Sequence, residues 1–316
     1  MTASKVTNYP NGLTMDTTVY RTLYSGSTIP TAGSTGYNPG AIFYLTNASL
    51  GQCPMWVNQG TAASCLFVPT GPVYGYGAVS AGGPVDCVSG SAATTLGQDL
   101  VMETDIAFSG HAVSDDNDQI ISVIATVGKA NITSTASADP LNAHDYVWAA
   151  LRNQCIPTWD IFAAGTAATA GGNVAEAITV TGALVGDIAF ANYSATNDTD
   201  TISDVAVTAD TVTVTASADP STTHGYHYVV MRPRGAFKPS HYVAYAGVHT
   251  TVGGAAAEAI TITGALATDI PIVVYNTTND SDTILKAVVT ADTLTVTCSA
   301  DPSTAHKLAY MLLRAY

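Results

Sequence analysis

The chain has 316 residues, which is enough for two or three domains with hydrophobic cores of their own. Only 11% of its residues are charged, and 10 basic against 24 acidic side chains give a formal net charge of −14. A surface of this charge repels phosphate backbones, which argues against nucleic-acid binding. No stretch approaches the roughly 18 apolar residues of a membrane span, so we expect no membrane contact.

The first residues, MTASKVTNYPNG, lack the apolar stretch of a secretory signal. The cysteines do not recur from one copy of the internal repeat described below to the next, as a disulfide framework would. We therefore expect free, mostly buried thiols in a protein made in a reducing cytoplasm. The five cysteines are Cys53, Cys65, Cys87, Cys155 and Cys298.

Residues 1–88 are rich in proline and aromatic residues, with short apolar runs at residues 41–45 and 64–69 between turn signals. This pattern predicts short strands and extended arms, and we interpret residues 1–88 as an anchoring region. We expect its aromatic side chains to be too exposed for a self-sufficient core. The candidate contact residues are Tyr9, Tyr20, Tyr24, Phe43, Tyr44, Trp56 and Phe67.

Beyond residue 88 the sequence repeats. Residues 165–233 and 247–315 align without a gap and are identical at 39 of 69 positions, and a fainter copy lies upstream. Segments such as TVTVTAS alternate threonine with apolar residues, which predicts strands with one wet and one buried face. No segment shows the apolar spacing of a helix. Three similar units in series indicate an array of repeated modules.

The predicted fold is therefore all-β. An N-terminal extended or β anchoring region precedes three tandem small β-sandwich modules of the immunoglobulin-like kind. The predicted modules span residues 89–154, 165–233 and 247–316, with linkers at residues 155–164 and 234–246.

Histidines and arginines recur at equivalent places in the three copies. No serine, cysteine or lysine nucleophile recurs near the histidines, each of which follows an aspartate by five residues. We interpret each pair as a turn in which Asp caps backbone amides and His begins the last strand. We expect each arginine to pair with a local carboxylate, and we predict neither catalytic nor cofactor-binding residues. The residues are Asp139 and His144, Asp219 and His224, Asp301 and His306, and the arginines Arg152, Arg232 and Arg314.

Acidic clusters also recur, at residues 115–118, 197–200 and 279–282. Carboxylate and amide oxygens suit Ca²⁺, which makes Asp118, Asp200 and Asp282 candidate ligands. Calcium needs about six to eight oxygens, however, and no distal glutamate or calcium-loop glycine recurs. We favour exposed polar turns without an obligatory metal, with a weak calcium site as the alternative.

Three long phrases resemble β-modules in structural proteins of tailed bacteriophages, such as head decoration proteins and head fibres. These are GYNPGAIFYLTNASLGQCPMWVNQGTAASCLFVP, TTVGGAAAEAITITGALATD and TLTVTCSADPSTAHKLAYMLLRA. The resemblance implies a non-enzymatic virion protein, made in the host bacterial cytoplasm, that decorates or projects from a capsid. Its implied partner is the major capsid protein, to which residues 1–88 would anchor through the candidate contact residues given above.

The alternative is a virion appendage that binds a receptor or a glycan. Glycan binders expose aromatic platforms, and the repeats offer few equivalent aromatics beyond Tyr193 and Tyr275, which favours decoration. Exposed edge strands and multiplied weak contacts favour a homo-oligomer. Trimers suit the local threefold positions of an icosahedral shell, so we expect three chains.

Overall fold

The computed structural model describes residues 23–48, 52–71, 73, 75–87, 93–97, 101–113, 120–126, 131–136, 144–169, 171–195, 200–218, 224–235, 237–277, 282–301 and 306–316. All regular elements in these ranges are β-strands, β1 to β22, and no helix occurs among them. The all-β prediction is confirmed. Tyr9, Tyr20, Asp118, Asp139 and Asp219 lie outside the described residues, as do the side chains of Cys87 and His144.

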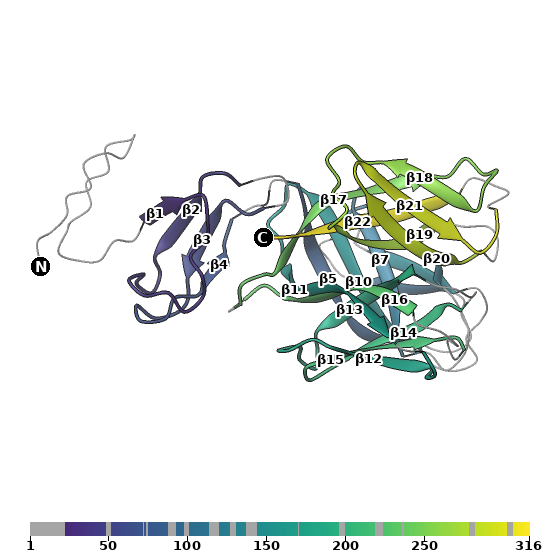
Figure 1. Ribbon diagram of the computed structural model, residues 1–316, viewed down its shortest axis with the longest axis horizontal. Coiled ribbons are helices and arrows are strands. Elements are labelled where there is room, and N and C mark those ends of the chain that lie inside the picture. The colour runs from purple at the N-terminus through teal and green to yellow at the C-terminus, as the bar shows by residue number, and fades with distance from the viewer. Residues whose placement is uncertain are drawn as a thin grey trace, which may run out of the picture.

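Four short strands form an N-terminal sheet in the order β1-β2-β3-β4 (Figure 1). Strand β1 runs parallel to β2, and the other two pairs are antiparallel. The short strands predicted near residues 41–45 and 64–69 are β2 and β4. The strands are β1 Leu23–Gly26, β2 Ile42–Leu45, β3 Met55–Asn58 and β4 Phe67–Pro69.

One face of this sheet is an aromatic core. Phe43 lies opposite Trp56 in the β2–β3 register, and Phe67 packs edge-on against Phe43 and Tyr37 at 5.7 and 5.3 Å. Phe43, Trp56 and Phe67 are all buried. The expectation that the aromatics of this region are too exposed to form a core is wrong, because the alternation of the strands places these three rings on one covered face.

The rest of the chain follows the same six-strand path three times. In each pass the first, third and sixth strands join a nine-stranded sheet, and the second, fourth and fifth form a separate three-stranded sheet. We call these passes the first, second and third units. The first comprises β5 Tyr76–Cys87, β6 Ala93–Gly97, β7 Ile106–Val113, β8 Ile120–Ala125, β9 Asn131–Ala136 and β10 His144–Asn153. The second comprises β11 Trp159–Thr169, β12 Ala175–Thr179, β13 Ile188–Ala195, β14 Ile202–Thr208, β15 Thr211–Ala216 and β16 His224–Pro233. The third comprises β17 His241–Thr250, β18 Ala257–Thr261, β19 Ile270–Thr277, β20 Ile284–Thr290, β21 Thr293–Cys298 and β22 Lys307–Ala315.

Two strands at the heart of the repeat behave as the threonine alternation predicts. Strands β15 and β21 bury every second residue, so that Val212 and Val214 enter the core of the second unit, where Tyr193 and Tyr226 also lie. The opening strands were not anticipated, since β11 and β17 begin at Trp159 and His241, inside segments predicted to be linkers. Strand β5 likewise lies within residues 1–88 but pairs with β10.

The three units share a second, central core. In β13, Ile188 and Phe190 face this central core, whereas Ala189 and Tyr193 face the core of their own unit. The other units contribute the same positions, so the central core has a threefold repeat of its own. Equivalent members are Ile106, Ile188 and Ile270; Phe108, Phe190 and Ile272; and Leu151, Met231 and Leu313.

The contacts between units close into a ring. Strand β7 packs on β14, β13 on β20, and β19 on β8, so each unit touches both others. At one end, the opening strands also meet, with Trp159 paired to Ala78 and Ile161 to His241. The three units of the predicted array therefore surround a pseudo-threefold axis and do not stand in a row.

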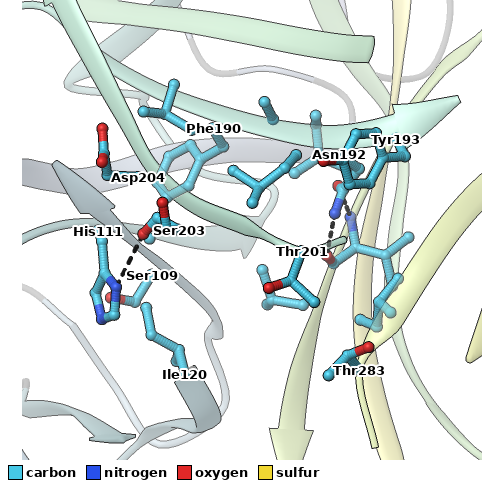
Figure 2. Close-up of a pocket in the computed structure, with 18 of the residues that line it drawn as sticks. Ser109, His111, Ile120, Phe190, Asn192, Tyr193, Thr201, Ser203, Asp204 and Thr283 are labelled. Atoms are coloured by element: carbon cyan, nitrogen blue, oxygen red, sulfur yellow. Dashed lines mark hydrogen bonds between the residues drawn. The ribbon is translucent and has the colours of Figure 1, made fainter. Parts of the chain in front are cut away.

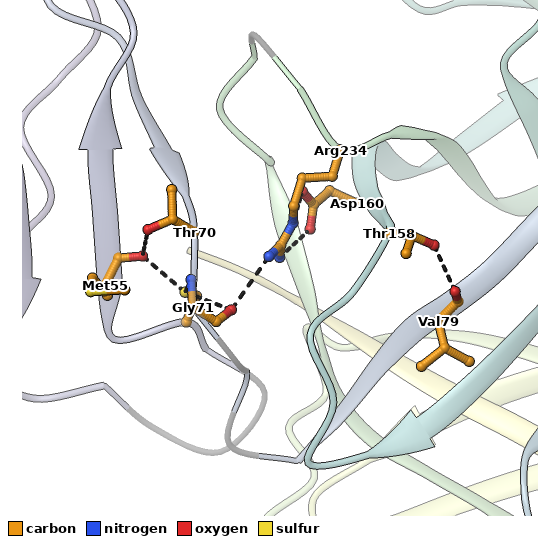
Figure 3. A network of polar contacts seen from close by, with 8 residues as sticks. Met55, Thr70, Gly71, Val79, Thr158, Asp160 and Arg234 are labelled. Carbon is orange, nitrogen blue, oxygen red and sulfur yellow. Dashed lines mark hydrogen bonds and ion pairs between the residues drawn. The ribbon is translucent and has the colours of Figure 1, made fainter. Parts of the chain in front are cut away.

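The N-terminal sheet sits at the end where β5, β11 and β17 begin, which we call the base (Figure 1). Tyr316 bridges the two parts, with ring centroids 5.2 Å from both Trp56 and Tyr242. Arg234 pairs with Asp160 at 2.8 Å and donates to the carbonyl of Gly71 at 3.3 Å (Figure 3). We call the opposite end, where β7, β13 and β19 end, the tip.

Removing the third unit tests ring closure. A chain ending at residue 240 would expose Ile188, Phe190 and Met231, which pack in the central core with the third unit. We expect this chain to lose cooperative thermal unfolding and to bind a hydrophobic dye, because large apolar surface is left uncovered. A linear array would instead keep its first two units folded. A cooperative transition close to that of the full chain would contradict the ring.

Candidate functional site

The recurring histidines occupy matching structural positions. His144 and His224 begin β10 and β16, and His306 directly precedes β22. The side chains of His224 and His306 are buried beside equivalent tyrosines, with ring centroids 5.2 Å from Tyr193 and 5.8 Å from Tyr275. Asp301 caps a backbone amide, accepting from Gly254 N at 2.7 Å. These geometries agree with the structural interpretation of the motif.

Each repeated arginine holds a buried aspartate at the base, as predicted. Arg152, Arg232 and Arg314 each donate through Nε and a terminal nitrogen to both carboxylate oxygens, at 2.6–2.8 Å. The aspartates are Asp105, Asp187 and Asp269, whose side chains are 0–3% exposed. This bidentate geometry is the most specific that arginine offers. We call each pair an Asp–Arg clasp.

The clasps fix three loops that expose an apolar side chain. In each loop, the clasp aspartate accepts from the amide three residues earlier, at 2.8 or 2.9 Å. That earlier residue is a large hydrophobe at all three positions, about half exposed. The residues are Met102 (55%), Leu184 (54%) and Leu266 (47%). Sequence reasoning missed this triplet, although a Met or Leu three residues before each aspartate is visible in the printed sequence.

The aromatic residues predicted to contact a capsid have different environments. Phe43, Trp56 and Phe67 are buried in the N-terminal core and are not available to a partner in this conformation. Tyr44 is 45% exposed on the other face of β2, beside Ile42, and Tyr24 is half-buried. Of the five candidates that lie within the described residues, Tyr44 is the most accessible.

Of the calcium candidates, Asp200 and Asp282 lie just before the equivalent strands β14 and β20, both half-buried. Within the described ranges, no group of three or more His, Cys, Asp or Glu side chains is arranged to hold a metal ion. The turn interpretation of these clusters therefore stays a prediction. The thiols of Cys53, Cys65, Cys155 and Cys298 are free and buried, as predicted.

Side chains cross each junction between units. His111 Nδ1 lies 3.1 Å from the carbonyl of Ser203, which joins the first unit to the second. Asn192 exchanges two hydrogen bonds with the backbone of Val273, at 2.8 and 3.0 Å. Asn276 donates to the carbonyl of Val123 at 2.9 Å and closes the third junction. The strands at these junctions are not paired with each other, so the side chains of one histidine and two asparagines supply hydrogen bonds to backbone groups that a neighbouring strand would otherwise supply.

A cavity of about 140 Å³ lies where the three units meet (Figure 2). Its wall comes from β7, β13 and β19 and from the starts of the strands that follow them. Ile120, Ile202 and Ile284, which are equivalent, all line it. The cavity therefore lies on the pseudo-threefold axis, and we call it the axial cavity.

The Asp–Arg clasp can be tested by breaking one partner. Replacing Arg232 by methionine leaves the carboxylate of Asp187 buried without its cation, which costs about 3 kcal/mol or more of unfolding free energy. Urea denaturation measures this loss. The double variant Arg232→Met with Asp187→Leu should recover much of it, because no charge is then left buried. Equal losses for the single and double variants would contradict this explanation.

His227 should make stability depend on pH. It lies between Thr166, 2.9 Å from Nδ1, and the carbonyl of Ala287 in the third unit, and burial lowers its pKa to about 4. Because an unfolded histidine has a pKa of about 6.5, the unfolded chain binds this proton first as the pH falls. Stability should therefore be lost between about pH 6.5 and 4, by up to about 3 kcal/mol.

The measurement is urea denaturation at pH 7.5, 5.5 and 4 of the wild type and of His227→Gln. Carboxylates also titrate in this range, so the informative quantity is the difference between the two proteins. That difference should shift in favour of the glutamine variant as the pH falls. A difference that stays constant with pH would rule out a proton-linked role for His227.

Among the described residues, no helix is long and apolar enough to cross a membrane. Comparison with known proteins finds no matching family model, no matching curated protein and no matching solved structure.

Proposed function

We propose that the protein is a structural component of a bacteriophage virion, a decoration or head-fibre protein bound to the major capsid protein. The N-terminal region anchors the chain, and the three units are small β-sandwich modules of the immunoglobulin-like kind. The phage assignment is based on the resemblance of the repeat and N-terminal phrases. The form of the base supports a surface-attached role.

The observation that carries this proposal is the arrangement of apolar groups at the base. The three clasped loops expose Met102, Leu184 and Leu266 at the end that also bears the N-terminal sheet. Large hydrophobes exposed at equivalent, rigid positions suit a surface that another protein covers. Each contact is weak alone, and three held in one body reinforce one another.

The pseudo-threefold symmetry within one chain changes the number of chains that we expect at each site on the capsid. One chain already presents three equivalent contact points, so a single copy fits a local threefold position without two further chains. We propose this stoichiometry in place of the homotrimer.

Glycan binding is less well supported than attachment. Tyr193 and Tyr275, one equivalent pair of aromatic residues in the repeats, are only 2% and 4% exposed. Both rings pack inside their units beside His224 and His306. An aromatic platform must present its face to solvent, and neither ring does so.

Polar substitutions at the three loops test the attachment. The triple variant Met102→Ser, Leu184→Ser and Leu266→Ser should fold normally, because these side chains are already half in water. If each substitution removes about 1 kcal/mol of binding free energy by reducing the apolar area buried at the capsid, the affinity of the protein for the particle should fall about 100-fold. The measurement is co-sedimentation with purified phage particles stripped of this protein.

Val252→Ser, at a residue that is 87% exposed near the tip, is the matched control and should bind as the wild type does. Unchanged binding of the triple variant would exclude the loops as the contact. If mass spectrometry of intact purified particles fails to find the wild-type protein, the virion assignment itself is wrong.

A further inference from the structure

The axial cavity has an asymmetric wall. His111, Ser203 and Asp204 lie on one side of it, and Asn192, Tyr193 and Thr283 on the other (Figure 2). Most polar groups of the wall are already engaged within the protein. Ser109 Oγ donates to the Val147 carbonyl at 3.0 Å, and Ser203 Oγ donates to the Thr215 carbonyl at 3.1 Å.

Among the lining residues that the structure describes, Asp204 is the one carboxylate, and none is Lys or Arg. Its Oδ1 accepts from the Thr215 hydroxyl at 3.0 Å, a neutral donor. Burial raises the pKa of Asp204, which is the expected effect of a wall that supplies no cation. The equivalent positions carry Ser122 and Lys286, so at this position of the repeat only the second unit has a carboxylate.

We propose that the axial cavity binds a small aliphatic amine in its ammonium form, with the charge beside Asp204 and the hydrocarbon against the isoleucines. Ile120, Ile202 and Ile284 supply apolar surface from all three units, and the Phe190 ring offers a face that attracts cations. The net charge of −14 favours a cation over an anion at any opening. This site is independent of the proposed attachment at the base.

The volume sets the size of the ligand. A cavity of about 150 Å³ holds benzene, which has six heavy atoms. The axial cavity, at about 140 Å³, therefore accommodates an ion such as n-butylammonium, with five. A hexose has twelve heavy atoms and could not be enclosed. The size of the cavity thus fits a small ligand of about five or six heavy atoms and argues against a fully enclosed sugar.

Isothermal titration calorimetry on the full chain tests the assignment with n-butylammonium and n-butanol, which share a shape and differ in charge. We expect the ammonium ion to bind at least tenfold more tightly than the alcohol. Asp204→Asn should remove this preference, and Glu103→Gln, at an exposed position near the base, should retain it. Absence of saturable ammonium binding, or equal affinity for the two probes, would overturn the proposal.

A second Asp204 variant and a third probe complete the titration experiment. Asp204→Ser, which installs the residue of the first unit, should behave like Asp204→Asn, and urea denaturation confirms that each variant is folded. Nα-acetyl-lysine amide distinguishes a free amine from a lysine side chain of another protein. Tighter binding of the lysine derivative than of n-butylammonium would overturn the assignment to a free amine, and retained preference in both Asp204 variants would exclude Asp204 as the recognising group.

Discussion

The central core shared by the three units is the constraint on which the rest of the structure depends. The strands of the large sheet are covered on one face by the core of their own unit and on the other by equivalent strands of the neighbouring units. Ile188 and Phe190 are buried only because the first and third units are present. The position of the base loops, the junctions and the axial cavity all follow from this packing, because each lies where units meet or where their strands begin and end.

Because the ring is closed within one chain, its three junctions can differ in sequence, whereas those of a homotrimer cannot. In a symmetric trimer the same residue must serve every junction. Here the junctions use His111, Asn192 and Asn276, at positions that are not all equivalent. Duplication supplied the common core, and each junction could then acquire its own polar contact. The same freedom allows Asp204, Ser122 and Lys286 to occupy one structural position, which makes the axial cavity chemically one-sided.

The sequence predicts the local features well and the ring poorly. Three predictions that rest on neighbouring residues or on the repeat itself are confirmed. They are the alternation of β15 and β21, the free thiols, and the arginine–carboxylate pairs. Strand β16 reads YHYVVMR because both of its faces are buried, so it shows no alternation that would reveal a second core. The opening strands β11 and β17 begin with dissimilar residues, and the repeat alignment starts six residues later. Ring closure depends on contacts between distant units, which no local pattern records.

The base of the ring connects the central core to the proposed role. At the base, clasps whose aspartates are almost wholly buried hold Met102, Leu184 and Leu266 in one geometry. Little conformational entropy therefore remains to be lost when a partner covers these side chains. Attachment of one rigid body also costs translational and rotational freedom once, whereas three separate chains would incur it three times. On the proposed attachment, internal duplication thus converts three weak apolar contacts into one strong one, and the central core is what keeps the three contacts in register.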